Sequence, residues 1–157
     1  MQKQKLTAEQ ALQKARHYCA YQERSHFEVK EKLYSFGLFK TEVEQLLSNL
    51  IEEDYLNEER FTKQFASGKF RLKQWGKIKI EHELKQKKVS SYNIKKTLKE
   101  IDEDEYLKVL QNLTQKKWSS LKAEQYLNRI TKTTNYLLQK GYEYALINNA
   151  IKQLRNK

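Results

Sequence analysis

An apolar pattern that occurs three times along the chain constrains its fold more than any other feature. The three windows begin at Leu33, Leu84 and Leu137, so their starts lie 51 and 53 residues apart. Apolar residues recur five, ten, fourteen and seventeen positions later, namely Leu38, Val43, Leu47 and Leu50, then Val89, Ile94, Leu98 and Ile101, then Tyr142, Ile147, Ile151 and Leu154. The last three positions have the i, i+4, i+7 spacing of a buried helix face. The sequence therefore predicts three copies of one helical unit.

A helix stop is expected four positions into each window. Gly37 and Gly141 occupy this position in the first and third copies. A glycine followed by an apolar residue is typical of a Schellman motif, in which the glycine takes a left-handed conformation. Lys88 stands there in the second copy, and the same geometry at a non-glycine residue costs about 1 kcal/mol. Ser90 is expected to cap the next helix, with Val89 and Ile94 as a hydrophobic staple.

A further helical stripe precedes each window, so each unit is expected to hold three helices. The stripes are Ala8, Ala11, Leu12, Ala15, Tyr18 and Cys19; then Phe61, Phe65 and Leu72; then Tyr106, Leu110 and Leu113. In the third copy, residues 119–140 could run as one long helix. We expect an all-α, elongated tandem array of three three-helix repeats, resembling a helical solenoid, over residues 1–56, 57–103 and 104–157.

The composition fits a helical protein. The 157 residues include no proline and four glycines, and 32% of them are charged. No stretch approaches the eighteen apolar residues of a membrane helix, and the first ten residues lack the apolar segment of a secretory signal. The single cysteine, Cys19, suits a reducing compartment and is expected to pack as a small apolar side chain. These features favour a cytoplasmic protein without membrane contact.

The positive charge is concentrated in the middle of the chain. Residues 1–59 hold 8 basic and 11 acidic side chains, residues 60–99 hold 13 and 2, and residues 100–157 hold 10 and 7. Acidic runs flank the basic segment at 52–59 and 100–105. A uniformly lysine-rich composition would not remove acids from one segment alone. The segregation predicts one cationic surface that meets a polyanion or an acidic partner.

The candidate contact residues lie between positions 69 and 88. Phosphate binding needs several cations on one exposed surface, because each neutralised phosphate releases counterions. The candidates for this role are Lys69, Arg71, Lys73, Lys77, Lys79, Lys85 and Lys87. Ile80 and Leu84 are expected to face the core. Trp75, beside Gly76 in the predicted turn, is the candidate for stacking on a base, and the alternative is a lid on the core.

Signals for catalysis, metals and cofactors are weak, so we expect a protein that is not an enzyme. His17, His26 and His82 have no Cys or His partner at a metal-ligand spacing, and no phosphate-binding glycine loop occurs. The acidic run before residue 60 is better explained by a helix that begins near Asn57, where Glu58 and Glu59 suit the N-terminus.

Residues 55–94 resemble the signature of the RecX family, bacterial regulators of the RecA recombinase. The matching residues are Leu56, Asn57, Glu58, Arg60, Phe61, Phe65, Gly76, Ile80, Glu83, Leu84 and Val89, with Arg24, Ser25, Lys32, Leu33, Gly37 and Leu38 upstream. The likeness covers most of residues 15–100, whereas residues 105–157 follow only the family's layout. Lys88 departs from the glycine that is usual at its position.

The resemblance implies tandem three-helix repeats and a function by binding. RecX proteins bind the RecA–single-stranded DNA filament, inhibit or disassemble it, and so restrain recombination, DNA repair and the SOS response. The partners implied are the RecA filament and single-stranded DNA, with non-specific duplex DNA as a further ligand, for a monomeric protein. Two alternatives are a basic DNA-binding protein of the helix-turn-helix kind that acts without recombinase, and a peptide-binding helical solenoid. The second would need an apolar groove, which the sequence does not indicate.

Overall fold

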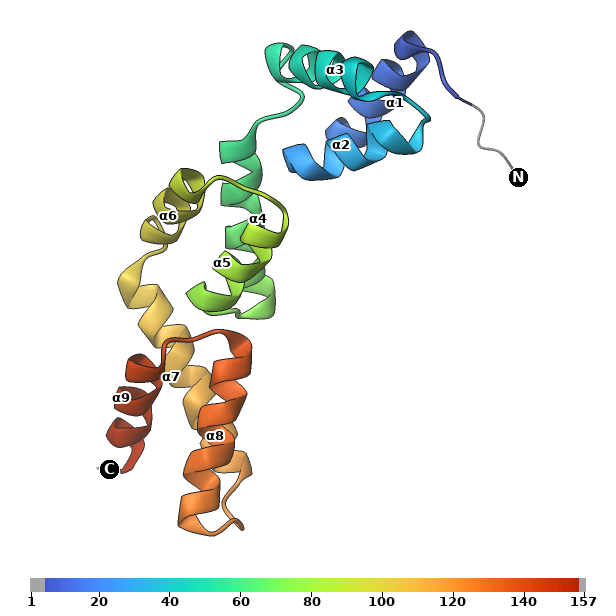
Figure 1. Ribbon diagram of the computed structural model, residues 1–157. Coiled ribbons are helices and arrows are strands. Elements are labelled where there is room, and N and C mark those ends of the chain that lie inside the picture. Colours follow the sequence, from blue (N-terminus) through green and yellow to red (C-terminus); the bar gives the residue numbers. More distant parts are fainter. Residues whose placement is uncertain (1–4, 156–157) are drawn as a thin grey trace. The chain divides into compact units, whose positions relative to one another are not determined.

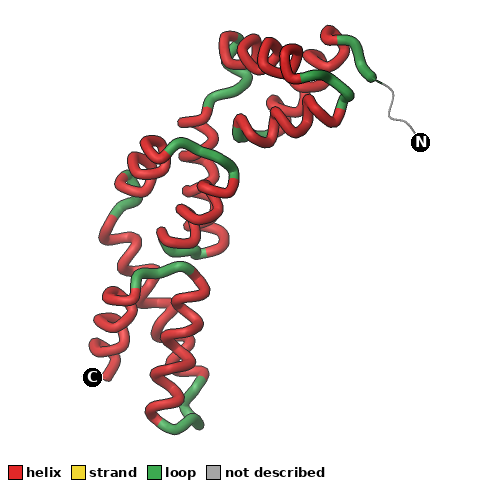
Figure 2. The backbone as a smooth tube through the Cα atoms, viewed as in Figure 1, coloured by secondary structure: helices red, strands yellow, loops and turns green. Residues whose placement is uncertain are grey.

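The computed structural model describes residues 5–155, which form nine α-helices and no strand (Figures 1 and 2). The helices are α1 (Ala8–Tyr21), α2 (His26–Ser35), α3 (Lys40–Glu52), α4 (Glu58–Lys73), α5 (Lys77–Gln86), α6 (Ser91–Lys99), α7 (Glu103–Ser120), α8 (Tyr126–Lys140) and α9 (Tyr144–Arg155). The prediction of an all-α fold built from three-helix sets is confirmed. The first four residues of the first predicted repeat and the last two of the third lie outside the described residues.

By internal packing the chain divides into two compact units. Unit 1 comprises Met1–Phe65 and Leu84–Ile94, and unit 2 comprises Ala66–Glu83 and Lys95–Lys157. Unit 1 thus holds the first helix set together with the start of α4 and the junction between α5 and α6. Unit 2 holds the third helix set together with the end of α4, most of α5 and the end of α6. The middle helices therefore contribute to two separate packing arrangements.

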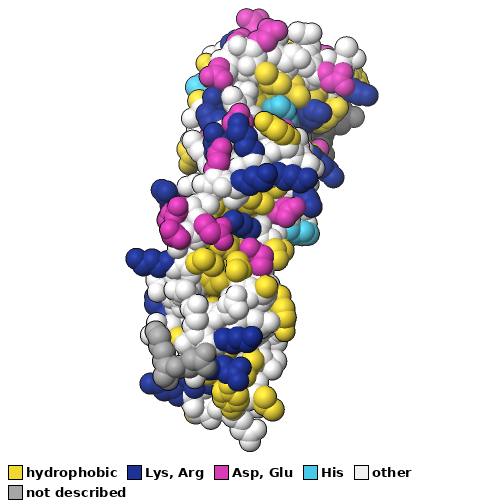
Figure 3. All heavy atoms as spheres, turned by 90° about the vertical axis from the view of Figure 1, so that its left-hand side faces the viewer, with side chains coloured by type: hydrophobic (Ala, Val, Ile, Leu, Met, Phe, Trp, Pro, Cys, Tyr) yellow, Lys and Arg dark blue, Asp and Glu magenta, His cyan; other side chains and the backbone are white. Residues whose placement is uncertain are grey.

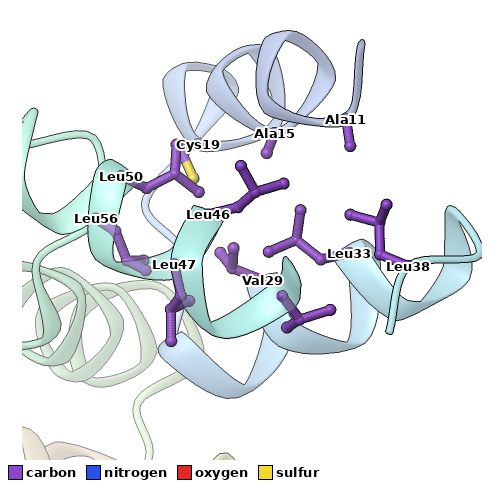
Figure 4. Packing of buried hydrophobic residues seen from close by; sticks show 11 residues of the cluster. Ala11, Ala15, Cys19, Val29, Leu33, Leu38, Leu46, Leu47, Leu50 and Leu56 are labelled. Carbon is purple, nitrogen blue, oxygen red and sulfur yellow. The ribbon is translucent and has the colours of Figure 1, made fainter. Parts of the chain in front are cut away.

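The core of unit 1 forms where α1, α2 and α3 face one another (Figure 4). Its buried side chains are Ala11, Ala15, Cys19, Val29, Leu33, Leu38, Val43, Leu46, Leu47, Leu50 and Leu56. Small residues on α1 allow the leucines of α2 and α3 to approach it closely. Burial raises the pKa of the Cys19 thiol to about 11, so the side chain stays a neutral thiol. The expectation that Cys19 packs as a small apolar residue is confirmed.

The three predicted helix stops share one geometry. The backbone φ angle is 85° at Gly37, 61° at Lys88 and 97° at Gly141. At the second stop the N–H of Val89 donates to the carbonyl of Leu84 at 3.2 Å, which is the long hydrogen bond of a Schellman motif. Lys88 therefore keeps the left-handed conformation without being glycine. The hydroxyl of Ser90 accepts the N–H of Asn93 at 3.3 Å, so the predicted cap of α6 is also present.

The prediction that Leu72 joins the buried stripe of α4 is wrong, because its side chain is 84% exposed. Phe61 is buried in unit 1, whereas Phe70 is buried in unit 2, where its ring lies 5.8 Å from that of Tyr106. Phe70 follows Phe61 by nine positions, which is two and a half turns of a helix with 3.6 residues per turn. The buried stripe of α4 runs through Thr62, Ala66 and Phe70 at a spacing of four residues, and Leu72 lies off this stripe, because it is about 200° from Phe70 around the helix. Leu72 continues the face of Phe61, which near the end of α4 is open to solvent.

The third set has the three expected helices, but a single helix over 119–140 is not formed, because α7 extends to Ser120 and α8 begins only at Tyr126. α7 ends at Ser120, and the N–H of Leu121 turns back to the carbonyl of Trp118 at 3.2 Å. The guanidinium of Arg129 donates through Nε to the same carbonyl at 2.8 Å. A side chain from α8 therefore satisfies the end of α7 and allows the chain to reverse without glycine or proline.

Candidate nucleic-acid interface

Six of the eight candidate residues fall in unit 2. They are Lys69, Arg71 and Lys73 in the last turns of α4, Trp75 in the connecting turn, and Lys77 and Lys79 at the start of α5. We call these six residues the Trp75 surface. Lys85 and Lys87 belong to unit 1 instead. The helix boundaries place the basic residues at the end of α4 and the start of α5, as the sequence predicts.

Two lysines flank the indole of Trp75. The ammonium nitrogens of Lys69 and Lys79 lie 5.0 and 4.5 Å from the centre of its ring, within the range of a cation–π interaction. The turn is fixed by Gln74, with a φ angle of 57°, and by the N–H of Trp75, which donates to the carbonyl of Lys69 at 3.2 Å. The ring is half-buried. Trp75 thus holds two cations in place and is not a fully buried core residue.

The other members of the Trp75 surface differ in their partners. The side chains of Arg71 and Lys73 are exposed. Within residues 5–155, neither they nor Lys79 form an ion pair with an acidic side chain. Lys77 is different, since its ammonium lies 3.5 Å from the Glu103 carboxylate and 4.8 Å from the ring centre of Tyr106. The positive charges of Arg71, Lys73 and Lys79 are therefore not neutralised by an acidic side chain of the described residues and are available to a ligand.

Lys87 is likewise engaged inside its own unit. Its ammonium lies 3.2 Å from the carboxylate of Glu28 and 5.8 Å from the ring centre of Phe65. This pair links the α5–α6 junction to α2. Lys85 is exposed at the end of α5. The face shown in Figure 3 mixes Lys and Arg side chains with Asp, Glu and hydrophobic ones, so on that face the positive charge is interrupted.

A glycine contact anchors the Trp75 surface to the third helix set. A Cβ atom on Gly76 would lie 2.3 Å from the carbonyl oxygen of Gly141, and one on Gly141 would lie 2.3 Å from Cβ of Lys79. The N–H of Gly76 donates to the carbonyl of Lys140 at 2.7 Å, and that of Ile78 donates to Gly141 at 3.0 Å. Both glycines are needed for this close approach, and the backbone hydrogen bonds fix its register.

Two buried tyrosines complete the same joint. The hydroxyl of Tyr106 accepts the N–H of Lys77 at 3.0 Å and donates to the carboxylate of Glu143. The hydroxyl of Tyr142 donates to the carbonyl of Gln74 at 2.9 Å, and the two rings lie 5.2 Å apart. Burial raises the pKa of both phenols well above the usual value, so both stay protonated donors. The sequence pattern identified both tyrosines as buried but gave no signal for these polar contacts.

No helix within residues 5–155 has the length and apolar character needed to cross a membrane. In the same part of the chain, no three His, Cys, Asp or Glu side chains are grouped so that they could hold a metal ion.

Comparison with protein families decides the relationship of the chain. The family model described as "RecX, second three-helix domain" matches residues 57–98, and the one described as "RecX, third three-helix domain" matches residues 103–151. The chain belongs to the RecX family. The match to the third RecX domain covers α7, α8 and most of α9. In this region the sequence alone indicated only the general layout of the family.

Individual RecX relatives agree with this assignment. The regulatory protein RecX of Lactobacillus gasseri is 31% identical over 129 residues, covering 72% of this chain and 48% of the relative. That of Clostridium botulinum is 32% identical over 131 residues, covering 82% and 61%. The chain spans about half the length of the curated relatives it matches.

The fold is shared with a solved member of the family. The crystal structure of RecX from Lactobacillus salivarius superimposes with a TM-score of 0.86 at 21% identity and covers 96% of this chain and 97% of the other.

Several residues that carry the RecX resemblance have structural roles. Asn57 caps α4 by accepting the N–H of Arg60 at 2.9 Å. The carboxylate of Glu58 accepts the N–H of Ser90 and the side-chain amide of Asn93, both at 2.9 Å. Arg60 binds the carboxylates of Glu23 and Asp54. These signature residues therefore hold helices together.

Proposed function

We propose that this chain is a non-catalytic regulator that binds the RecA–single-stranded DNA filament and inhibits or disassembles it in the cytoplasm. Membership of a family of regulatory proteins supports the regulatory role, and the filament as target follows from the resemblance to that family. The single observation that carries the site is a group of cations at the α4–α5 turn that have no acidic partner in the described residues, in which Arg71 and Lys73 are exposed and the half-buried Lys79 lies over the Trp75 ring. We further propose that the repeats span residues 1–56, 57–103 and 104–157.

In this proposal the Trp75 surface binds phosphates of the filament DNA or acidic side chains of its protein. Arg71 and Lys73 supply exposed charge, and Lys79 is held by the indole ring, so less side-chain entropy is lost when it binds. The half-buried ring of Trp75 retains area for stacking on an unpaired base. Lys69 and Lys85 remain part of the proposed site, whereas Lys77 and Lys87 are assigned a weaker share, since each neutralises a carboxylate within the fold.

A charge-removal variant tests this site. Arg71→Gln combined with Lys73→Gln removes two exposed cations without adding bulk, and both residues lie in the last turn of a long helix. The matched control is Lys14→Gln with Lys30→Gln, which removes the same charge from exposed positions on α1 and α2. Inhibition of the DNA-dependent ATPase of RecA is measured against protein concentration, and thermal melting checks the fold.

We expect the Arg71/Lys73 variant to need about ten times more protein for half-maximal inhibition, because two charge-assisted contacts of modest strength are lost. The Lys14/Lys30 control should inhibit as the parent does. Equal potency of a correctly folded Arg71/Lys73 variant and the parent would refute the site. If instead DNA alone accounts for every effect, with a steep salt dependence and no need for recombinase, the chain is a plain DNA-binding protein.

A further inference from the structure

The third helix set carries a second concentration of positive charge. Residues 106–155 hold nine Lys or Arg and two Glu. Most acids of this set lie at the start of α7, where Asp102 caps the helix by accepting the N–H of Glu105 at 2.9 Å. Glu124 pairs with Lys132, and Glu143 accepts the hydroxyl of Tyr106. The two acids within the basic part are therefore already engaged.

Three of these cations stack on aromatic rings. The guanidinium carbon of Arg129 lies 4.0 Å from the ring centre of Trp118, and that of Arg155 lies 5.1 Å from the ring centre of Tyr126. Trp118 and Tyr126 contact each other edge to face at 6.2 Å. The ammonium of Lys117 lies 5.0 Å from the ring centre of Tyr136. We call these residues the Trp118 cluster, namely Lys117, Trp118, Tyr126, Arg129, Tyr136 and Arg155.

Most of the cluster lies where the end of α7, the start of α8 and the end of α9 come together, and Tyr136 lies further along α8. Cations at the ends of α7 and α9 also interact favourably with the helix dipoles, so part of the reason for their position is structural. Arg129 has a capping role through its Nε atom, which donates to Trp118. Its other nitrogens, however, find no carboxylate within residues 5–155, and neither do Lys117 and Arg155. Tyr126 remains 48% exposed.

Stacked cations with no carboxylate partner are suited to a particular class of ligand. The rings hold the guanidinium groups in fixed orientations, which reduces the entropy lost on binding. A guanidinium binds a phosphate through two parallel hydrogen bonds. A nucleic acid offers phosphates to the cations and a base to the exposed ring of Tyr126, whereas an acidic protein surface offers partners only for the cations.

We propose that the Trp118 cluster is a second nucleic-acid contact surface, which binds the phosphodiester backbone. This cluster shares no residue with the Trp75 surface. The inference rests on the proposed function only in assuming that the ligand is a nucleic acid. The phosphates come from either single-stranded or duplex DNA, and oligonucleotides of both kinds are used in the test.

The two tryptophans of the chain allow each surface to report binding by itself. In a Trp75→Phe variant, Trp118 is the remaining indole, and in Trp118→Phe the remaining indole is Trp75. We expect oligonucleotide to change the fluorescence of Trp118 in the first variant. Lys117→Gln with Arg155→Gln, added to that variant, should remove the change, whereas Lys14→Gln with Lys30→Gln should leave it intact.

Salt dependence supplies an independent readout. Loss of two phosphate contacts should reduce the slope of log affinity against log salt by about 1.4 on single strands and about 1.8 on duplex. Binding reported by Trp118 but not by Trp75 would support this inference and would show that the Trp75 surface does not contact free DNA, which leaves acidic side chains of the filament protein as its proposed ligand. Binding reported by Trp75 alone, with an unchanged slope in a folded Lys117/Arg155 variant, would overturn the inference.

Discussion

At the scale of single residues, Glu58 shows how one side chain links distant parts of unit 1. Its carboxylate accepts two hydrogen bonds from the start of α6, and His26 Nδ1 lies 3.9 Å away. Burial by itself would raise the pKa of Glu58. The hydrogen bonds from Ser90 and Asn93, together with the nearby imidazole, outweigh that effect and leave the pKa below its usual value. Folding is therefore linked to the ionisation of this carboxyl.

The linkage predicts a pH-dependent difference between the parent and Glu58→Gln. A carboxyl whose pKa is lowered by folding contributes stability that is complete above the unfolded pKa, near 4.5, and is lost as the pH falls through the folded value. The advantage of the parent in the free energy of unfolding should thus be constant from pH 6 to 7 and shrink below about pH 4.5. Urea unfolding at several pH values measures it. A difference that stays constant down to pH 3 would contradict the assigned role.

Substitution of Lys88 by glycine is expected to stabilise the protein rather than destabilise it, because this residue is held at a φ angle of 61°. Lys88→Gly should raise the free energy of unfolding by about 1 kcal/mol, since glycine adopts the left-handed conformation without steric cost. Lys88→Ala removes the same charge but keeps the Cβ atom, and it should give no such gain. Urea unfolding of the three proteins provides the measurement, and equal stability of the Gly and Ala variants would show that the turn is not strained.

At the scale of helices, α4 and α5 each contribute to both compact units, and their glycines have different roles. Gly68 lies inside α4, and a Cβ atom there would meet no atom within 4 Å apart from the adjacent backbone of its own helix. Gly76 lies against Gly141 with no room for a side chain. The first glycine weakens its helix without a packing reason, whereas the second allows the contact that holds the Trp75 surface in place.

Alanine substitutions should therefore change stability in opposite directions. Gly68→Ala should raise the free energy of unfolding by about 0.5 to 1 kcal/mol, the usual difference in helix propensity. Gly76→Ala should lower it by about 1 to 3 kcal/mol, because the added methyl group forces the two backbones apart. Thermal or urea unfolding checks both. A neutral Gly76→Ala would mean that the joint between α5 and the α8–α9 turn is looser than described.

The same helices show what the sequence could predict. Periodicity and turn chemistry identified the three helix stops and the buried residues Leu33, Leu84 and Leu137, because these depend on neighbours within one turn. Periodicity failed for Leu72, because the face of Phe61 that it continues is buried only at the start of α4. The break before α8 lacks glycine and proline, so no local signal marked it. The pairing of Lys77 with Glu103 and of Lys87 with Glu28 joins residues far apart in sequence, and spacing on one helix could not reveal it.

At the scale of the whole molecule, the chain combines structural joints built from RecX signature residues with exposed cations that have no carboxylate partner in the described residues. The joints hold Glu58 against α6 and Gly76 against Gly141. The cations lie on the Trp75 surface and in the Trp118 cluster. A binding protein with this design needs no catalytic group. In the proposed function, selectivity for a filament over naked DNA requires contacts with the recombinase in addition to phosphates.

The most direct test of the proposed function is the affinity of the labelled chain for RecA filaments on single-stranded DNA, held with a non-hydrolysable ATP analogue, against the same DNA without RecA. Both are measured by fluorescence anisotropy at one salt concentration. We predict at least about tenfold tighter binding to the filament, equal to about 1.4 kcal/mol, and a smaller preference for the Arg71/Lys73 variant. Equal or weaker binding to the filament would contradict the account.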